Sequence, residues 1–131
     1  MRVNSVVTIL LLVLTTSCNK SSASLPVISP RKIQYELYTN SDFSDNNTNI
    51  RFSLFIRTKT KVLLDSDLAP MKIKDIPDAS NKIIIIKTVP NNDTSELSVG
   101  FLYSIEGIGN SWHLDTIRAG ETFKLVDYAF Q

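Results

Sequence analysis

His113 is the only histidine in the chain, so it is the one side chain suited to act as a general base near neutral pH. It lies in Trp112-His-Leu-Asp115, a segment expected to be a strand. Neighbouring side chains on a strand point to opposite faces, so His113 and Asp115 should share a face. We place Trp112 in the core. No Gly-x-Ser-x-Gly motif marks a nucleophile, and we therefore predict no enzyme, with a small hydrolase that uses His113 as the alternative.

Three short segments, residues 41–47, 65–67 and 91–93, are dense in the oxygen-bearing side chains that calcium prefers. None of them has the spacing of an EF-hand loop. Asn and Asp also favour turns, because their side chains hydrogen-bond to the nearby backbone. We therefore interpret the three segments as turns and predict neither a metal site nor a cofactor.

Aromatic rings offer a further kind of chemistry, because flat faces of this sort can stack on a sugar. Tyr38 and Phe55 fall on the polar faces of their expected strands, so they are the candidates for an exposed ligand platform. A carbohydrate-binding module would require such rings to lie exposed and coplanar.

Cys18 is the only cysteine, which excludes both a disulfide within the chain and a cluster of thiolate metal ligands. It directly follows the parts of an export signal: Arg2, an apolar stretch over residues 6–14, and small residues at 15–17. The apolar stretch is too short to span a bilayer comfortably, since that takes roughly 20 residues.

This arrangement resembles the lipobox of bacterial lipoproteins, in which the cysteine thiol is joined to diacylglycerol and signal peptidase II cuts before it. Ser17 fits the small residue before the cysteine. Thr15 stands where Leu is usual, as in the looser lipoboxes of the Bacteroidetes. The resemblance implies a signal peptide over residues 1–17 and a lipid anchor at Cys18, in the outer membrane of a bacterial envelope. An ordinary secretory signal or an uncleaved anchor is the alternative.

The composition is that of one globular domain. The chain has 131 residues, of which 43% are hydrophobic and 21% charged. Lys and Arg number 14 against 13 Asp and Glu, and no dense basic cluster is present. Because nucleic-acid binding is driven largely by clustered cations, we expect no nucleic-acid partner. Residues 18–30 are rich in Ser and Pro, as in a flexible tether, and residues 31–131 form the expected domain.

Short alternating segments dominate that domain, and sustained helical spacing is missing. Turn-rich breaks separate the segments. The pattern predicts an all-β fold, a single antiparallel, immunoglobulin-like β-sandwich of about seven to eight strands, with a small β-barrel as the alternative. The expected strands are residues 32–38, 49–57, 60–65, 71–76, 82–89, 96–105, 112–118 and 122–130.

Residues 83–86 are four consecutive isoleucines, flanked by Lys82 and Lys87. Such a run predicts a strand in the centre of a sheet, and an intermolecular interface is the alternative. An exposed run of this kind is an aggregation hazard, against which the flanking lysines act as charged gatekeepers.

The layout of signal, tether and opening strand Lys32-Ile-Gln-Tyr-Glu-Leu37 resembles small immunoglobulin-like β-sandwich lipoproteins of the Bacteroidetes. That resemblance implies a fold and a location, and no activity. We therefore expect a non-enzymatic binding or structural module of the cell envelope. Its expected partners are membrane lipid through Cys18 and another envelope protein or a glycan. A carbohydrate-binding module at the cell surface is the more specific alternative.

Overall fold

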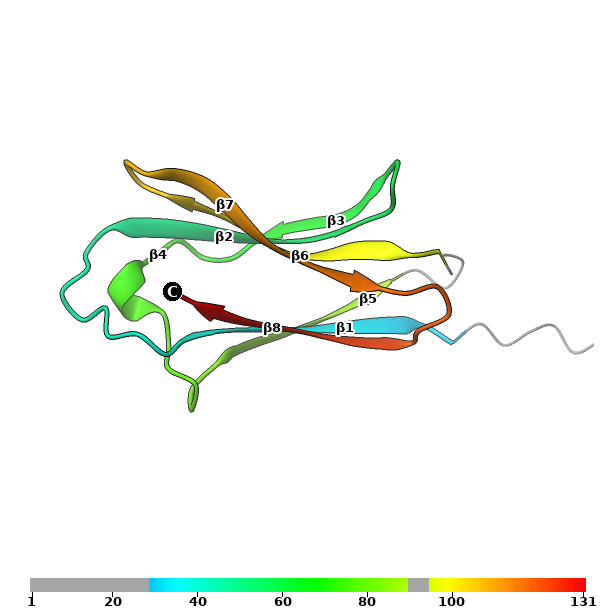
Figure 1. Cartoon of the computed structure of the whole chain (residues 1–131), viewed down its shortest axis with the longest axis horizontal. Coiled ribbons are helices and arrows are strands. Elements are labelled where there is room, and N and C mark those ends of the chain that lie inside the picture. Colours follow the sequence, from blue (N-terminus) through cyan, green and yellow to red (C-terminus); the bar gives the residue numbers. More distant parts are fainter. Residues whose placement is uncertain (1–28, 90–94) are drawn as a thin grey trace, which may run out of the picture.

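Two β-sheets packed face to face make up the described part of the protein, residues 29–89 and 95–131 of a computed structural model (Figure 1). The expected signal peptide, Cys18 and most of the tether lie outside the described residues. The all-β sandwich predicted from the strand spacing is confirmed, and the two sheets do not close into a barrel.

In the described residues the two sheets contain eight strands, and one short 3-10 helix lies between β4 and β5. Sheet A has the order β5-β1-β8, and sheet B has the order β3-β2-β6-β7, with β4 added beside β2. The elements are β1 (Arg31–Thr39), β2 (Asn49–Arg57), β3 (Val62–Asp67), β4 (Met71–Lys72), η1 (Ile73–Asp75), β5 (Ile83–Val89), β6 (Leu97–Ile105), β7 (Gly109–Ile117) and β8 (Phe123–Phe130).

One strand pair departs from the antiparallel rule. The first strand, β1, lies antiparallel to β5 but parallel to the last strand, β8, with Lys32 opposite Phe123 and Thr39 opposite Phe130. Every other pair in the two sheets is antiparallel. The parallel pair joins the two ends of the domain in one sheet.

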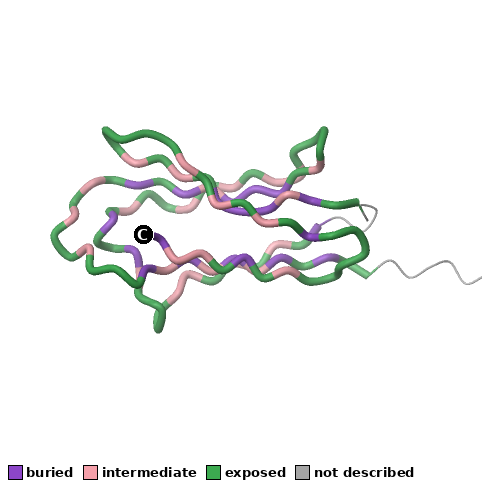
Figure 2. Tube along the Cα trace, in the orientation of Figure 1, coloured by how far each residue is buried: buried purple, intermediate pink, exposed green. Residues whose placement is uncertain are grey.

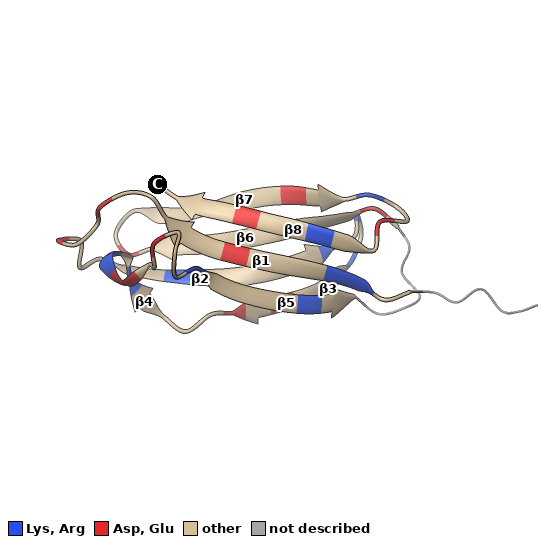
Figure 3. Ribbon diagram, turned by 90° about the horizontal axis from the view of Figure 1, so that it is seen from below, with Lys and Arg blue, Asp and Glu red and all other residues tan. Residues whose placement is uncertain are grey.

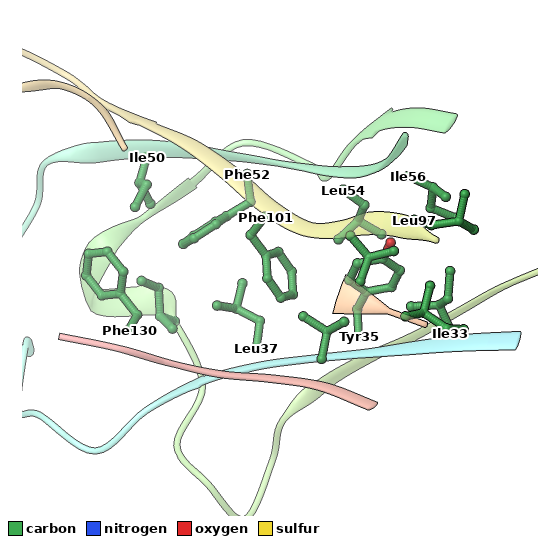
Figure 4. Packing of buried hydrophobic residues seen from close by; sticks show 14 of the residues in the cluster. Ile33, Tyr35, Leu37, Ile50, Phe52, Leu54, Ile56, Leu97, Phe101 and Phe130 are labelled. Atoms are coloured by element: carbon green, nitrogen blue, oxygen red, sulfur yellow. The ribbon is translucent and has the colours of Figure 1, made fainter. Parts of the chain in front are cut away.

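Strict alternation of apolar residues builds the core. On β1, Ile33, Tyr35 and Leu37 are fully buried, while the residues between them face outward. Strands β2 and β6 alternate in the same way and supply the opposite wall, so that buried segments face one another across the two sheets (Figure 2). Rings from both sheets meet edge to face in the middle, with Tyr35 and Phe52 on either side of Phe101 (Figure 4).

Strand β5, which contains the isoleucine run, is the edge of sheet A and not its centre. It pairs with β1 alone. Ile83 and Ile85 are half-buried against the core, whereas Ile84 and Ile86 point outward and are more than half exposed. The prediction of a central strand was therefore wrong, because a continuous apolar run does not reveal which of its faces is covered.

Gly100 allows β6 and β7 to approach more closely than any side chain would permit. A Cβ atom at this position would lie 1.9 Å from the backbone oxygen of His113 and 3.2 Å from the ring of Phe55. The strand spacing here therefore depends on the missing side chain.

We expect Gly100→Ala to lower the free energy of unfolding by about 3 kcal/mol, since a methyl group would collide with a carbonyl that cannot move without breaking the β6–β7 ladder. Urea denaturation measures the change. Ser98→Ala, on the same face of the same strand, is the control and should stay within about 0.5 kcal/mol of the parent. Equal stability of the two variants would contradict this account of the strand spacing.

Candidate functional site

His113 lies on the inner side of β7, at the lateral edge of the sandwich. Its ring stacks on Tyr128 of β8, with centroids 4.6 Å apart and planes inclined by 18°. The Tyr128 hydroxyl donates to that of Tyr103 at 3.1 Å. As predicted, Asp115 shares the face of His113, but its carboxylate pairs with Lys124 at 2.7 Å. These contacts connect sheet A to sheet B along one edge.

The surroundings of His113 are those of a packed ring. No hydrogen bond of this ring occurs among the described residues, and in the same residues no three His, Cys, Asp or Glu side chains are grouped to hold a metal. The contact that the structure gives His113 is therefore an aromatic stack on Tyr128.

The oxygen-rich loop between β1 and β2 uses its side chains on its own backbone. Asp42 Oδ1 accepts from the amide of Ser44, and Asn46 Oδ1 accepts from the amide of Thr48, both at 3.0 Å. The hydrogen bonds from Ser44 lower the pKa of Asp42. The loop borders an open hollow of about 800 Å³, but its geometry is that of a turn capped by its own side chains.

Tyr38 and Phe55 do not form a ligand platform. Phe55 is only 5% exposed, on the outer side of sheet B, with the Arg57 guanidinium 5.2 Å from its ring. Tyr38 lies half-exposed on the outer side of sheet A, with Lys82 Nζ 4.2 Å from its ring. The expectation of a shared platform was wrong, because the two strands belong to different sheets.

Trp112 is exposed, contrary to the prediction that it lies in the core. Its side chain is 60% exposed on the outer side of sheet B. Leu102 lies directly across from it on β6, and Leu114 follows two residues along β7; these two are 42% and 47% exposed. Together the three apolar side chains form a continuous patch, here called the Trp112 face.

Register explains this outward orientation. Ile117, at the end of β7, is fully buried, so the residues two and four positions before it also point inward. Trp112 and Leu114 must then point outward, although their hydrophobicity alone favours the core. The alternation of β6 is the sequence pattern that indicates an apolar patch on this outer face, because the inward residues of β6 leave Leu102 pointing outward.

Hydrogen-bonding groups border the Trp112 face on one side. A hollow of about 430 Å³ lies there, lined by Asn49, Arg51, Pro70, Ser104 and Glu106. The Asn49 amide donates to the Glu106 carboxylate at 2.7 Å, which holds both side chains in place. Ser104 follows Leu102 by two residues on the same face of β6, so the apolar patch and the polar hollow are adjacent.

Arg31 is a second feature that sequence reasoning missed. Its side chain is only 4% exposed, at the start of β1. The guanidinium donates to the backbone oxygens of Ser95, Arg118 at 2.8 Å and Glu121 at 2.9 Å. These acceptors precede β6 or lie between β7 and β8, so Arg31 binds the start of the domain to both sheets.

Comparison of the chain with protein-family models, with curated proteins and with solved structures found no match. In the part of the chain that the structure describes, no helix is long and apolar enough to cross a membrane. The fold and the site define an all-β sandwich with exposed apolar side chains on the outer sides of both sheets, among them the Trp112 face of sheet B.

Two tyrosines make the stability of the domain sensitive to alkaline pH. Burial raises the pKa of both Tyr35 and Tyr128, and in Tyr128 the hydrogen bond with Tyr103 adds to the increase. A folded-state pKa above the unfolded value of about 10 gives stability that is complete below that pH and is lost as pH rises above it. We expect urea unfolding to show this loss, and a smaller one in the double variant Tyr35→Phe with Tyr128→Phe. An unchanged pH dependence in that variant would contradict the assignment.

Proposed function

We propose that this protein is a lipid-anchored, non-enzymatic binding module of the bacterial cell envelope, tethered through Cys18, which binds another envelope component through the Trp112 face. The binding role is inferred from the exposure of three large apolar side chains on one sheet face. The lipobox resemblance around Cys18 supports the anchor.

The free energy available at the Trp112 face supports a binding role. Full burial of a large apolar side chain contributes about 1.5–3 kcal/mol, so covering each of these, which are 42–60% exposed, contributes roughly half of that. Contiguous exposed apolar groups with a polar rim are typical of interaction sites. Tryptophan is also enriched among the residues that dominate binding energies. Trp112 lies beside Leu102, and Ser104, two residues further along the outer face of β6, lines the polar hollow, so a partner that buries the Trp112 ring could also hydrogen-bond to the hollow.

A glycan is one partner class that a specific observation favours. An exposed indole ring on the same side of sheet B as a hollow lined by amide, guanidinium and carboxylate groups offers a sugar both stacking and hydrogen bonds. The ring that would stack on the sugar is then Trp112, in place of Tyr38 and Phe55. An envelope protein, the other partner class, would instead cover all three apolar side chains of the Trp112 face.

The lipid anchor is tested by Cys18→Ala. We expect the variant either to leave the membrane fraction or to accumulate as an uncut precursor, because two or three acyl chains on one residue would otherwise anchor the protein almost permanently. Cell fractionation and intact mass are the measurements, with Ser22→Ala in the tether as control. An unchanged mass and fractionation of Cys18→Ala would refute the anchor.

The binding face is tested by photo-cross-linking in the cell. We expect a photoreactive phenylalanine at position 114 to give a defined adduct, because that position lies in the Trp112 face. Position 125, 42% exposed on the outer side of sheet A, is the matched control and should give none. Equal cross-linking at both positions, or none at either, would argue against the assignment.

The nature of the partner can be read from the fluorescence of Trp112, the only tryptophan in the chain. If the partner is a glycan, titration with peptidoglycan fragments or envelope polysaccharide should shift the emission to shorter wavelength. Trp112→Ala should weaken retention on the immobilised glycan about tenfold or more, which corresponds to about 1.4 kcal/mol. Emission unmoved by these glycans would eliminate this class and leave a protein partner.

A further inference from the structure

Cations gather at the end of the sandwich where β1 begins. Seven lysines and arginines lie exposed or half-exposed there, and they come from the ends of strands and the turns that join them: Lys32, Arg57, Lys59, Lys61, Lys87, Arg118 and Lys124. The exposed or half-exposed carboxylates among the described residues at the same end are Asp65, Glu96, Asp115 and Glu121, of which Asp115 pairs with Lys124. Cations therefore exceed carboxylates there by seven to four among the described residues. We call this region the basic end.

The opposite end of the sandwich carries the reverse charge. It contains five exposed carboxylates and three exposed cations: Asp42, Asp45, Asp75, Asp78 and Glu106, with Arg51, Lys72 and Lys74. On the outer side of sheet A, Figure 3 shows blue segments where β1 begins and β5 ends, and red segments further along β1 and β8. The two ends of a nearly neutral chain thus carry opposite excesses of charge.

Strand register places the basic end beside the tether. The first residue of β1, Arg31, lies opposite Val89 at the end of β5, and Lys32 lies opposite Phe123 at the start of β8. The hydrogen bonds of the buried Arg31 guanidinium fix this start of the domain to the turn before β8. The tether therefore joins the domain at a defined position within the basic end.

Two exposed apolar side chains accompany these cations. Phe123 is 55% exposed beside Lys32, and Val62 is 61% exposed beside Arg57. Basic residues together with an exposed aromatic ring are typical of surfaces that lie at the boundary between lipid headgroups and water. This combination favours a bilayer over a soluble anion as the partner.

We infer that the basic end docks on anionic lipid headgroups and holds the domain end-on against the membrane. The inference rests on the proposed lipid anchor, because the twelve residues 19–30 could separate Cys18 from β1 by at most about 45 Å. Attraction between such charges falls off within about 8 Å at physiological salt, so it acts once the anchor has brought the domain to the surface. The acidic end then faces away from the lipid.

The experiment uses the mature lipidated protein in vesicles of phosphatidylcholine, with or without phosphatidylglycerol. Cys18 is the only native cysteine and its thiol would be bonded to diacylglycerol, so one introduced cysteine can be labelled specifically. The labels are placed at Thr60→Cys in the basic end and at Ser44→Cys in the opposite end. A quencher on the lipid headgroups should quench the label at position 60 only when phosphatidylglycerol is present, and should spare position 44 in both vesicles.

Charge variants supply the controls. Lys59→Glu with Lys61→Glu should reduce quenching at position 60 to its level in pure phosphatidylcholine, and high salt should do the same. The matched pair Lys72→Glu with Lys74→Glu, in the opposite end, should change nothing. Both pairs are exposed, so folding should be retained.

The outcomes separate the two proposals. If the protein co-sediments with both vesicles but position 60 is never quenched, end-on docking is overturned and the anchor stands. Equal quenching in both vesicles overturns the role of anionic headgroups. If the protein sediments with neither vesicle, the anchor and the docking fail together.

Discussion

The double pairing of β1 is the constraint on which the rest of the sandwich depends. This strand is antiparallel to β5 on one side and parallel to β8 on the other, so sheet A cannot exist without it. Its buried face supplies Tyr35, whose hydroxyl donates to the backbone oxygen of Phe55 in sheet B at 2.9 Å. At its ends, Arg31 and Thr39 hydrogen-bond to neighbouring backbone. One strand thereby sets the order of its sheet, the distance between the sheets and the position of the turns.

Alternation in the sequence was sufficient to predict the fold class and most strands, because half-buried strands reveal their faces by a period of two. The expected strands 49–57 and 96–105 correspond closely to β2 and β6. Alternation was insufficient where hydrophobicity and register disagree. Trp112 is turned outward by the inward register of Ile117, and Phe55 is covered although it lies on an outer face. Sheet membership was also beyond the sequence, which is why Tyr38 and Phe55 were grouped.

The two faces of β7 divide the candidate chemistry. Its inner face contributes His113 and Asp115 to the contacts that connect the sheets, through Tyr128 and Lys124. Its outer face contributes Trp112 and Leu114 to the apolar patch. His113 and Asp115 therefore contribute to the contacts between the sheets, while the large apolar side chains of the opposite face stay exposed. Residue type alone favours the opposite assignment, with His113 in a functional site and Trp112 in the core.

The parallel pairing of β1 and β8 has a mechanical consequence. Because the two strands run in the same direction, the chain enters the domain at one end and finishes at the other (Figure 1). A force applied between the N-terminal side and the C-terminus would pull these neighbours past each other along their length. Their ladder of hydrogen bonds would then bear the load together, as in shear, instead of opening one bond at a time. The sandwich is therefore built to resist tension along its long axis.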